Sequence, residues 1–188
     1  MKQDIFRLAI WNAYINLDLS KIINFCEIVK AQIKSENKSN RGYQSPDISL
    51  NEPVIADLKQ HIIRESQNYL KSINLKKDIK LGNIWFNVNE FKDFNISHIH
   101  SGILSGVFYL KTPTECGKIV FQSPYMELMD TVFCESLTKE NCNIYNSTSW
   151  EFDPIANQLL IFPSFLRHYV EPNLNLNEDR MSISFNII

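Results

Sequence analysis

The chain has 188 residues, of which 44% are hydrophobic and 21% are charged, and its formal net charge is −2. This composition is typical of a folded globular protein and argues against a disordered chain. Without a long basic run, the sequence shows no evident source of attraction to nucleic acid or an acidic membrane. No apolar run is long enough to span a bilayer and no apolar leader begins the sequence, so by elimination we expect a cytoplasmic protein with reduced thiols.

The length predicts a single domain, 1–188, whose N-terminal part, 1–77, is mainly helical. Ile5–Tyr14 is typical of a strand, and apolar residues at helical spacing predict a helix over about 18–34. A polar loop follows, and a second helix is predicted to begin near Asn51. Its expected buried face contains Val54, Ile55, Leu58, Ile62, Tyr69 and Leu70.

In residues 78–188 the apolar pattern alternates, which is typical of strands. The polar and aromatic stretch 123–153 is predicted to be an insertion or a lid that selects the substrate. Helices followed by many short antiparallel strands predict an α+β fold built on a sandwich or jelly-roll barrel, whose open mouth is the usual ligand site. The predicted strands are Lys80–Val88, Ile96–His100, Ser105–Lys111, Lys118–Gln122, Gln158–Phe162, His168–Val170 and Arg180–Ile187.

Three of the four histidines fall in this β region. His98 and His100 occupy alternate positions of one predicted strand, which would place them on the same face about 7 Å apart, where they can converge on one metal ion. A strand histidine is usually structural, and such a pair alone is weak evidence for a metal. His168 and the later pair Arg180 and Ser182 strengthen the hypothesis, because a guanidinium binds a carboxylate through two hydrogen bonds.

Several blocks of sequence surround these residues in a fixed order. They are W-F-N at 85–87, H-I-H at 98–100, L-S-G-V-F-Y-L at 104–110, G-K-I-V-F at 117–121, L-L-I-F-P-S at 159–164, H-Y-V-E-P-N at 168–173 and R-M-S-I-S-F-N at 180–186. In order and spacing they resemble the Fe(II)/2-oxoglutarate-dependent dioxygenases, and more narrowly a group of uncharacterised phage and marine bacterial members. The resemblance covers most of residues 40–188.

The resemblance implies a double-stranded β-helix (jelly roll) with the N-terminal helices packed on it. His98 and His168 would be ligands of Fe(II), and Arg180 would hold the far carboxylate of 2-oxoglutarate, with Ser182 beside it. The implied reaction uses O2, converts 2-oxoglutarate to succinate and carbon dioxide, and hydroxylates a C–H bond of a small molecule or a peptidyl side chain. Two further contacts to the co-substrate are implied, from Tyr109 and Asn87.

The sequence departs from the family pattern at His100, where an aspartate or glutamate is usual. We favour His100 as a third metal ligand; the other interpretations are a water molecule at that position or a carboxylate such as Glu127 from the insertion. A neutral third ligand leaves the metal more positive. Two other functions remain open: a cupin-like three-histidine enzyme that does not use 2-oxoglutarate, and a non-catalytic binding protein.

The expected partners follow from these patterns. We expect a small-molecule or peptidyl substrate, no nucleic acid and no membrane, and both a monomer and a homodimer remain open. Arg167 neighbours His168 in the chain and is predicted to face away from it, at the surface.

Overall fold

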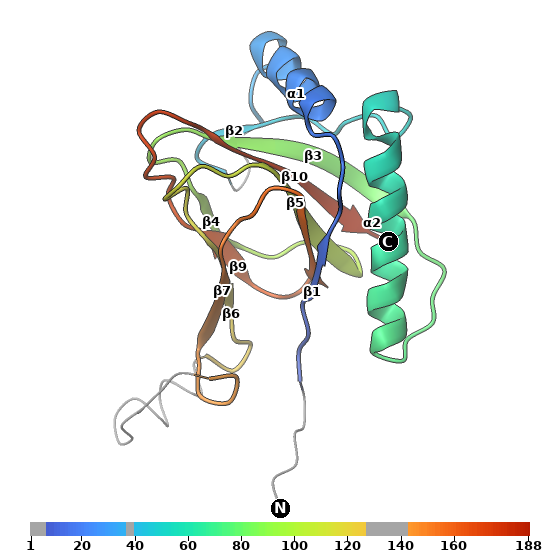
Figure 1. Ribbon diagram of the computed structural model, residues 1–188. Helices are drawn as coiled ribbons and strands as arrows, with labels where there is room; N and C mark the ends of the chain where they lie inside the picture. The colour runs from blue at the N-terminus through green and yellow to red at the C-terminus, as the bar shows by residue number, and fades with distance from the viewer. Residues whose placement is uncertain (1–6, 37–39, 127–142) are drawn as a thin grey trace, which may run out of the picture.

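The computed structural model describes residues 7–36, 40–126 and 143–188 (Figure 1). No helix within these ranges is long and apolar enough to cross a membrane. The elements are β1 (Trp11–Tyr14), α1 (Ser20–Gln32), β2 (Tyr43–Gln44), a 3-10 turn (Pro53–Ile55), α2 (Ala56–Ser72), β3 (Leu81–Asn89), β4 (Asn95–His98), β5 (Leu104–Lys111), β6 (Ile119–Gln122), β7 (Ser149–Phe152), β8 (Gln158–Pro163), β9 (His168–Val170) and β10 (Arg180–Ile187).

The strands form two antiparallel sheets. The larger sheet has the order β1-β8-β5-β10-β3-β2, and the smaller has the order β4-β9-β6-β7. Both helices lie on the side of the larger sheet that faces away from the smaller one (Figure 1). This arrangement confirms the predicted jelly roll with N-terminal helices packed on it.

Alternation along the strands of the larger sheet divides the apolar side chains between two cores. Phe108 and Leu159 belong to the cluster that also contains the buried helix residues, whereas their neighbours Val107 and Leu160 belong to a second cluster with Phe121 of the smaller sheet. The larger sheet is therefore buried on both faces. This explains why its central strands are apolar almost throughout and keep a fixed register.

Several predicted bounds differ from the structure. β1 is short, and Ile5 of the predicted strand lies outside the described residues. A 3-10 turn with Pro53 at its first position precedes α2, so the α-helix begins at Ala56 rather than near Asn51; the fixed φ of proline suits such a first turn. Two strands were missed: β2 in the predicted loop and β7 in the predicted insertion. Both strands are short: β2 pairs with the longer strand β3, and β7 pairs with the more apolar strand β6. Their own sequences therefore show little alternation of apolar and polar residues.

Candidate metal centre and co-substrate pocket

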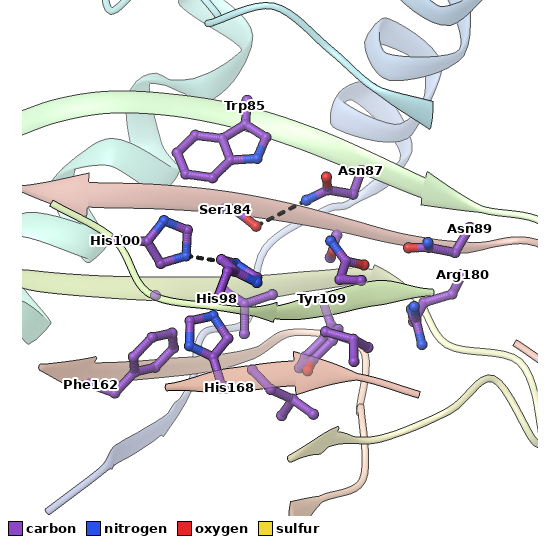
Figure 2. Close-up of a pocket in the computed structure, with 16 residues that line it drawn as sticks. Trp85, Asn87, Asn89, His98, His100, Tyr109, Phe162, His168, Arg180 and Ser184 are labelled. Atoms are coloured by element: carbon purple, nitrogen blue, oxygen red, sulfur yellow. Dashed lines mark hydrogen bonds between the residues drawn. The ribbon is translucent and has the colours of Figure 1, made fainter. Parts of the chain in front are cut away.

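The three histidines of the β region come together between the two sheets (Figure 2). One ligand nitrogen from each of His98, His100 and His168 lies within 4.8 Å of the others. The ring centroids are 4.4 Å apart for His98 and His168, 4.7 Å for His98 and His100, and 5.2 Å for His100 and His168. These distances allow all three rings to bind one metal ion after small side-chain rotations.

Strand pairing and a bend produce this cluster. His98 ends β4 and lies opposite His168, the first residue of β9, in antiparallel register. His100 lies beyond the end of β4, so strand alternation does not explain its position, and that part of the prediction was wrong. Instead the chain bends, and the His100 amide donates a hydrogen bond to the carbonyl of Ser164 at 2.9 Å, which returns the ring to the cluster.

Backbone carbonyls fix the orientation of two of the rings. Nδ1 of His98 lies 2.6 Å from the carbonyl oxygen of Ile96, and Nδ1 of His168 lies 2.8 Å from that of Leu166. Because a carbonyl only accepts, each Nδ1 carries the proton, and each Nε2 keeps its lone pair for a ligand. Nε2 of His98 and Nε2 of His100 are 3.2 Å apart, so in the metal-free protein His100 donates to His98.

Burial keeps the three imidazoles neutral. It is the main cause that lowers the pKa of all three rings, to about 4 for His100 and about 3 for His168, and the neighbouring histidines lower both further. Neutral imidazole is the form that binds metal. Two aromatic rings pack against His168, the most buried of the three histidines. The distance between ring centroids is 4.7 Å for Phe162 and 5.7 Å for Phe121.

Arg180 lies in the same pocket as the histidines, and its side chain is 1% exposed. Its Nη1 donates to the carbonyls of Cys116, Gly117 and Glu171. Its Nη2 is buried and has no hydrogen-bond partner among the described residues. A buried guanidinium nitrogen without a partner is costly, so this atom marks a place for an anionic oxygen.

The other predicted co-substrate residues lie beside Arg180 on neighbouring strands. Ser182 of β10 is paired with Tyr109 of β5 on one side and with Asn87 of β3 on the other. All three line the pocket. Asn87 is already engaged, because its Nδ2 donates to the hydroxyl of Ser184 at 3.0 Å (Figure 2).

Sequence reasoning missed Asn89, which lines this pocket, and Asn40, which lies behind the lining. Asn40 is buried and links two pocket residues: its Nδ2 donates to Asn87 at 3.2 Å, and its Oδ1 accepts from Asn89 at 2.7 Å. Period-two spacing from Asn87 could have indicated Asn89 and Trp85, which line the same face of β3. No sequence signal indicated Asn40, because it reaches the site from a loop.

Comparison with known proteins identifies the family. Residues 83–186 match the family model described as "Putative 2OG-Fe(II) oxygenase", a span that contains more than half of the chain, the three clustered histidines and Arg180. The chain belongs to this 2OG-Fe(II) oxygenase family. Iron and 2-oxoglutarate are therefore its metal and co-substrate, as predicted, and the oxygenase is an oxidoreductase. The narrower likeness to phage and marine bacterial members stays a prediction.

Solved structures have the same fold as the oxygenase at low sequence identity. A prolyl-4-hydroxylase from Pseudomonas putida is 14% identical with a TM-score of 0.65, and the match covers 95% of this chain and 92% of that one. A viral collagen prolyl hydroxylase from Paramecium bursaria Chlorella virus-1, in complex with 2OG, is 13% identical with a TM-score of 0.62, and the match covers 95% of this chain and 94% of that one. The epimerase SnoN, in complex with Fe3+, alpha-ketoglutarate and nogalamycin RO, is 13% identical with a TM-score of 0.69, and the match covers 97% of this chain and 79% of that one. No curated protein matches the oxygenase.

The pocket fits the cofactors of the family. Three neutral nitrogens within 4.8 Å suit a divalent metal ion, and the unpartnered Nη2 of Arg180 suits a carboxylate of 2-oxoglutarate. Among the described residues the ligand set differs from the usual pattern, because those that line the pocket include no aspartate or glutamate. Glu127, the other candidate for a carboxylate ligand, lies outside the described residues.

Proposed function

We propose that His98, His100 and His168 hold Fe(II) and that the oxygenase hydroxylates a C–H bond of a small molecule or a peptidyl side chain. The observation that carries the proposal is one pocket with three convergent neutral imidazoles and a buried guanidinium nitrogen that has no hydrogen-bond partner in the described part of the chain. A purely structural histidine cluster would have no use for that nitrogen, whereas 2-oxoglutarate needs both features, because it must bind a metal and be held at its far carboxylate.

In this proposal Arg180 holds the far carboxylate of 2-oxoglutarate, and Ser182 and Tyr109 donate hydroxyl hydrogen bonds to it. Burial raises the pKa of Tyr109, so its phenol stays protonated and can donate. Nη1 of Arg180 is already committed to backbone carbonyls, which fixes the plane of the guanidinium before the ligand arrives. Asn87 lies beside Ser182, and its remaining amide hydrogen is available to the same ligand.

Bound Fe(II) with 2-oxoglutarate supplies the oxidising chemistry: O2 is consumed, 2-oxoglutarate becomes succinate and carbon dioxide, and one oxygen atom enters the substrate as a hydroxyl group. The chain supplies the geometry. Carbonyl partners of His98 and His168 keep each Nε2 directed at the metal position. Phe162 and Phe121 pack against His168 and exclude water from that side.

Anaerobic titration of the Fe(II)-loaded protein with 2-oxoglutarate tests this function, with the visible charge-transfer absorption of the metal–co-substrate complex as the readout. We expect a saturable band in the wild type and a loss of at least tenfold in 2-oxoglutarate affinity in Arg180→Lys. The lysine keeps the positive charge and removes the planar fork. Ser182→Ala is the milder matched variant, with a loss of a few-fold from one hydrogen bond.

Other outcomes would assign another function. Bound iron without a band would favour a cupin-like three-histidine enzyme that does not use 2-oxoglutarate. Failure to bind iron at stoichiometric concentration would favour a binding protein that has kept the barrel. The unfolding temperature of Arg180→Lys is the control for a folding defect. In the wild type, Nη1 of Arg180 donates hydrogen bonds to three backbone carbonyls, and the substitution removes this nitrogen.

A further inference from the structure

A row of polar side chains crosses the larger sheet beside the metal centre. Asn186 of β10 is paired with Asn83 of β3 on one side and with Ser105 of β5 on the other, and we call these three residues the polar row. Alternation along β10 puts the row on the same face as Ser182 and Ser184, which line the pocket. Ser105 and Asn186 are buried, where a polar group is unfavourable unless it has a hydrogen-bond partner.

The hydrogen bonds of the polar row run in one direction. A carboxylate only accepts, so Asn83 turns its Nδ2 toward Asp47 at 3.2 Å, and its Oδ1 accepts from Nδ2 of Asn186 at 2.9 Å. Oδ1 of Asn186 then accepts from the Ser105 hydroxyl at 2.7 Å. This donation uses the single hydroxyl hydrogen of Ser105. In the 2.8 Å contact between the hydroxyls of Ser105 and Ser164, Ser164 is therefore the donor, and this bond anchors its side chain.

Ser164 connects the polar row to the loop that carries His100. Its carbonyl accepts a hydrogen bond from the His100 amide at 2.9 Å, and its own amide donates to the carbonyl of Ile103 at 3.2 Å. The loop turns between these two contacts at Gly102, whose φ of +119° is open to glycine and strained for other residues. The backbone of Ser164 thus joins both ends of the loop, and the hydroxyl of Ser105 holds Ser164.

We propose that Ser105 is a positioning residue for the metal centre: through Ser164 it holds His100 where the ring can bind the metal. The inference rests on the proposed function, because it takes His100 as the third ligand. His98 and His168 belong to the paired strands β4 and β9, and this pairing holds them without Ser164. Loss of the Ser105 hydroxyl should therefore loosen one ligand of the three and leave the other two in place.

The test uses Co(II) as the probe, without 2-oxoglutarate. Co(II) binds the same nitrogen ligands as Fe(II), and its visible absorption depends on the ligands around it. Metal-free protein is titrated anaerobically, which gives an affinity and a spectrum. For Ser105→Ala we expect an affinity roughly tenfold below that of the wild type, since groups that orient metal ligands contribute about 10- to 100-fold. The spectrum should move toward that of His100→Ala.

Two further single variants accompany this titration. Ser164→Ala breaks the same hydroxyl contact from its other side and should give the same loss, so it replaces Ser105→Ala if that variant fails to fold. Ser66→Ala is the matched control. Ser66 is a buried serine of α2 whose hydroxyl has no hydrogen-bond partner among the described residues, and its removal should leave Co(II) affinity within about twofold of the wild type.

A double-mutant cycle decides whether Ser105 acts through His100. Adding Ser105→Ala to His100→Ala should change Co(II) affinity by less than about twofold, because the ligand that Ser105 positions is already gone. A tenfold loss in both backgrounds would mean a general loosening of the fold and would overturn the proposal. The same cycle with Ser164→Ala gives an independent reading.

The single variants separate this inference from the function it rests on. Weakened Co(II) binding in His100→Ala, with wild-type affinity and spectrum in Ser105→Ala and Ser164→Ala, would remove the inference alone. Wild-type affinity and spectrum in His100→Ala would remove His100 from the ligands, and with it both the ligand set proposed above and this inference.

Discussion

Asn40 is the residue whose replacement should most clearly connect stability with co-substrate binding. Its side chain is 1% exposed and makes four hydrogen bonds. Nδ2 donates to the Tyr43 carbonyl at 2.7 Å and to Asn87 at 3.2 Å, and Oδ1 accepts from the Gly42 amide at 2.8 Å and from Asn89 at 2.7 Å. Asn40→Ala removes the side-chain amide, so each of the four partner groups loses its hydrogen bond to it.

The expected magnitude follows from these contacts. Each net hydrogen bond contributes on the order of 1 kcal/mol, and a buried group left without a partner costs about 1–3 kcal/mol. Water can enter the small cavity and recover part of this loss. We therefore expect Asn40→Ala to lower the free energy of unfolding by about 2–4 kcal/mol. Since Asn87 and Asn89 also lose their orientation, we expect the half-saturating concentration of 2-oxoglutarate to rise about five- to tenfold.

Urea unfolding and 2-oxoglutarate titration of the Fe(II)-loaded protein measure the two effects. Asn68→Ala is the matched control, because Asn68 is exposed on α2 and makes one contact to Glu65; its unfolding free energy should change by less than about 0.5 kcal/mol. A destabilisation of Asn40→Ala no larger than that of the control, with unchanged 2-oxoglutarate binding, would refute the role assigned to the amide network.

Three other predictions concern the cluster and the sheet. His168→Ala should abolish stoichiometric iron binding, measured by metal analysis after gel filtration, while His61→Ala should not; equal iron in both would remove His168 from the ligands. Burial lowers the pKa of His168 to about 3 and of His100 to about 4, below the unfolded value near 6.5, so the unfolded chain binds more protons. The free energy of unfolding of the metal-free protein should therefore fall below pH 6.5, by at most about 1.4 kcal/mol per pH unit for each group, and more shallowly in His168→Ala. Gly106→Ala should destabilise by about 1–3 kcal/mol in urea unfolding, because a Cβ there would overlap the Phe185 ring and lie 2.6 Å from the Leu160 carbonyl. Gly82→Ala, whose nearest atom would be 3.2 Å away, should cost less, and the reverse order would contradict the close packing of β5 against β10.

The sequence by itself determined the fold class and the chemical type of the site. Period-two alternation from about residue 80 indicated most of the strands, because a strand with two different faces records them in its own residues. The two histidines of H-I-H, His168 and Arg180 indicated a metal and a carboxylate ligand, because imidazoles bind divalent metals and a guanidinium binds a carboxylate through two hydrogen bonds; the resemblance of the surrounding blocks to the family supported both. These properties are local or depend on residue type, so they can be read without coordinates.

Tertiary structure alone decided how these groups meet. The pairing of β4 with β9 places His98 opposite His168, and the hydrogen bond to Ser164 places His100, which lies beyond the strand that was expected to contain it. Three carbonyls from two distant loops hold Nη1 of Arg180, and in that orientation Nη2 meets no hydrogen-bond partner within residues 7–36, 40–126 and 143–188. The hydrogen bonds of the Asn40 amide depend in the same way on contacts between residues far apart in the chain. Such contacts leave no periodic pattern in the sequence, because each is set by the packing of two sheets rather than by the conformation of one segment.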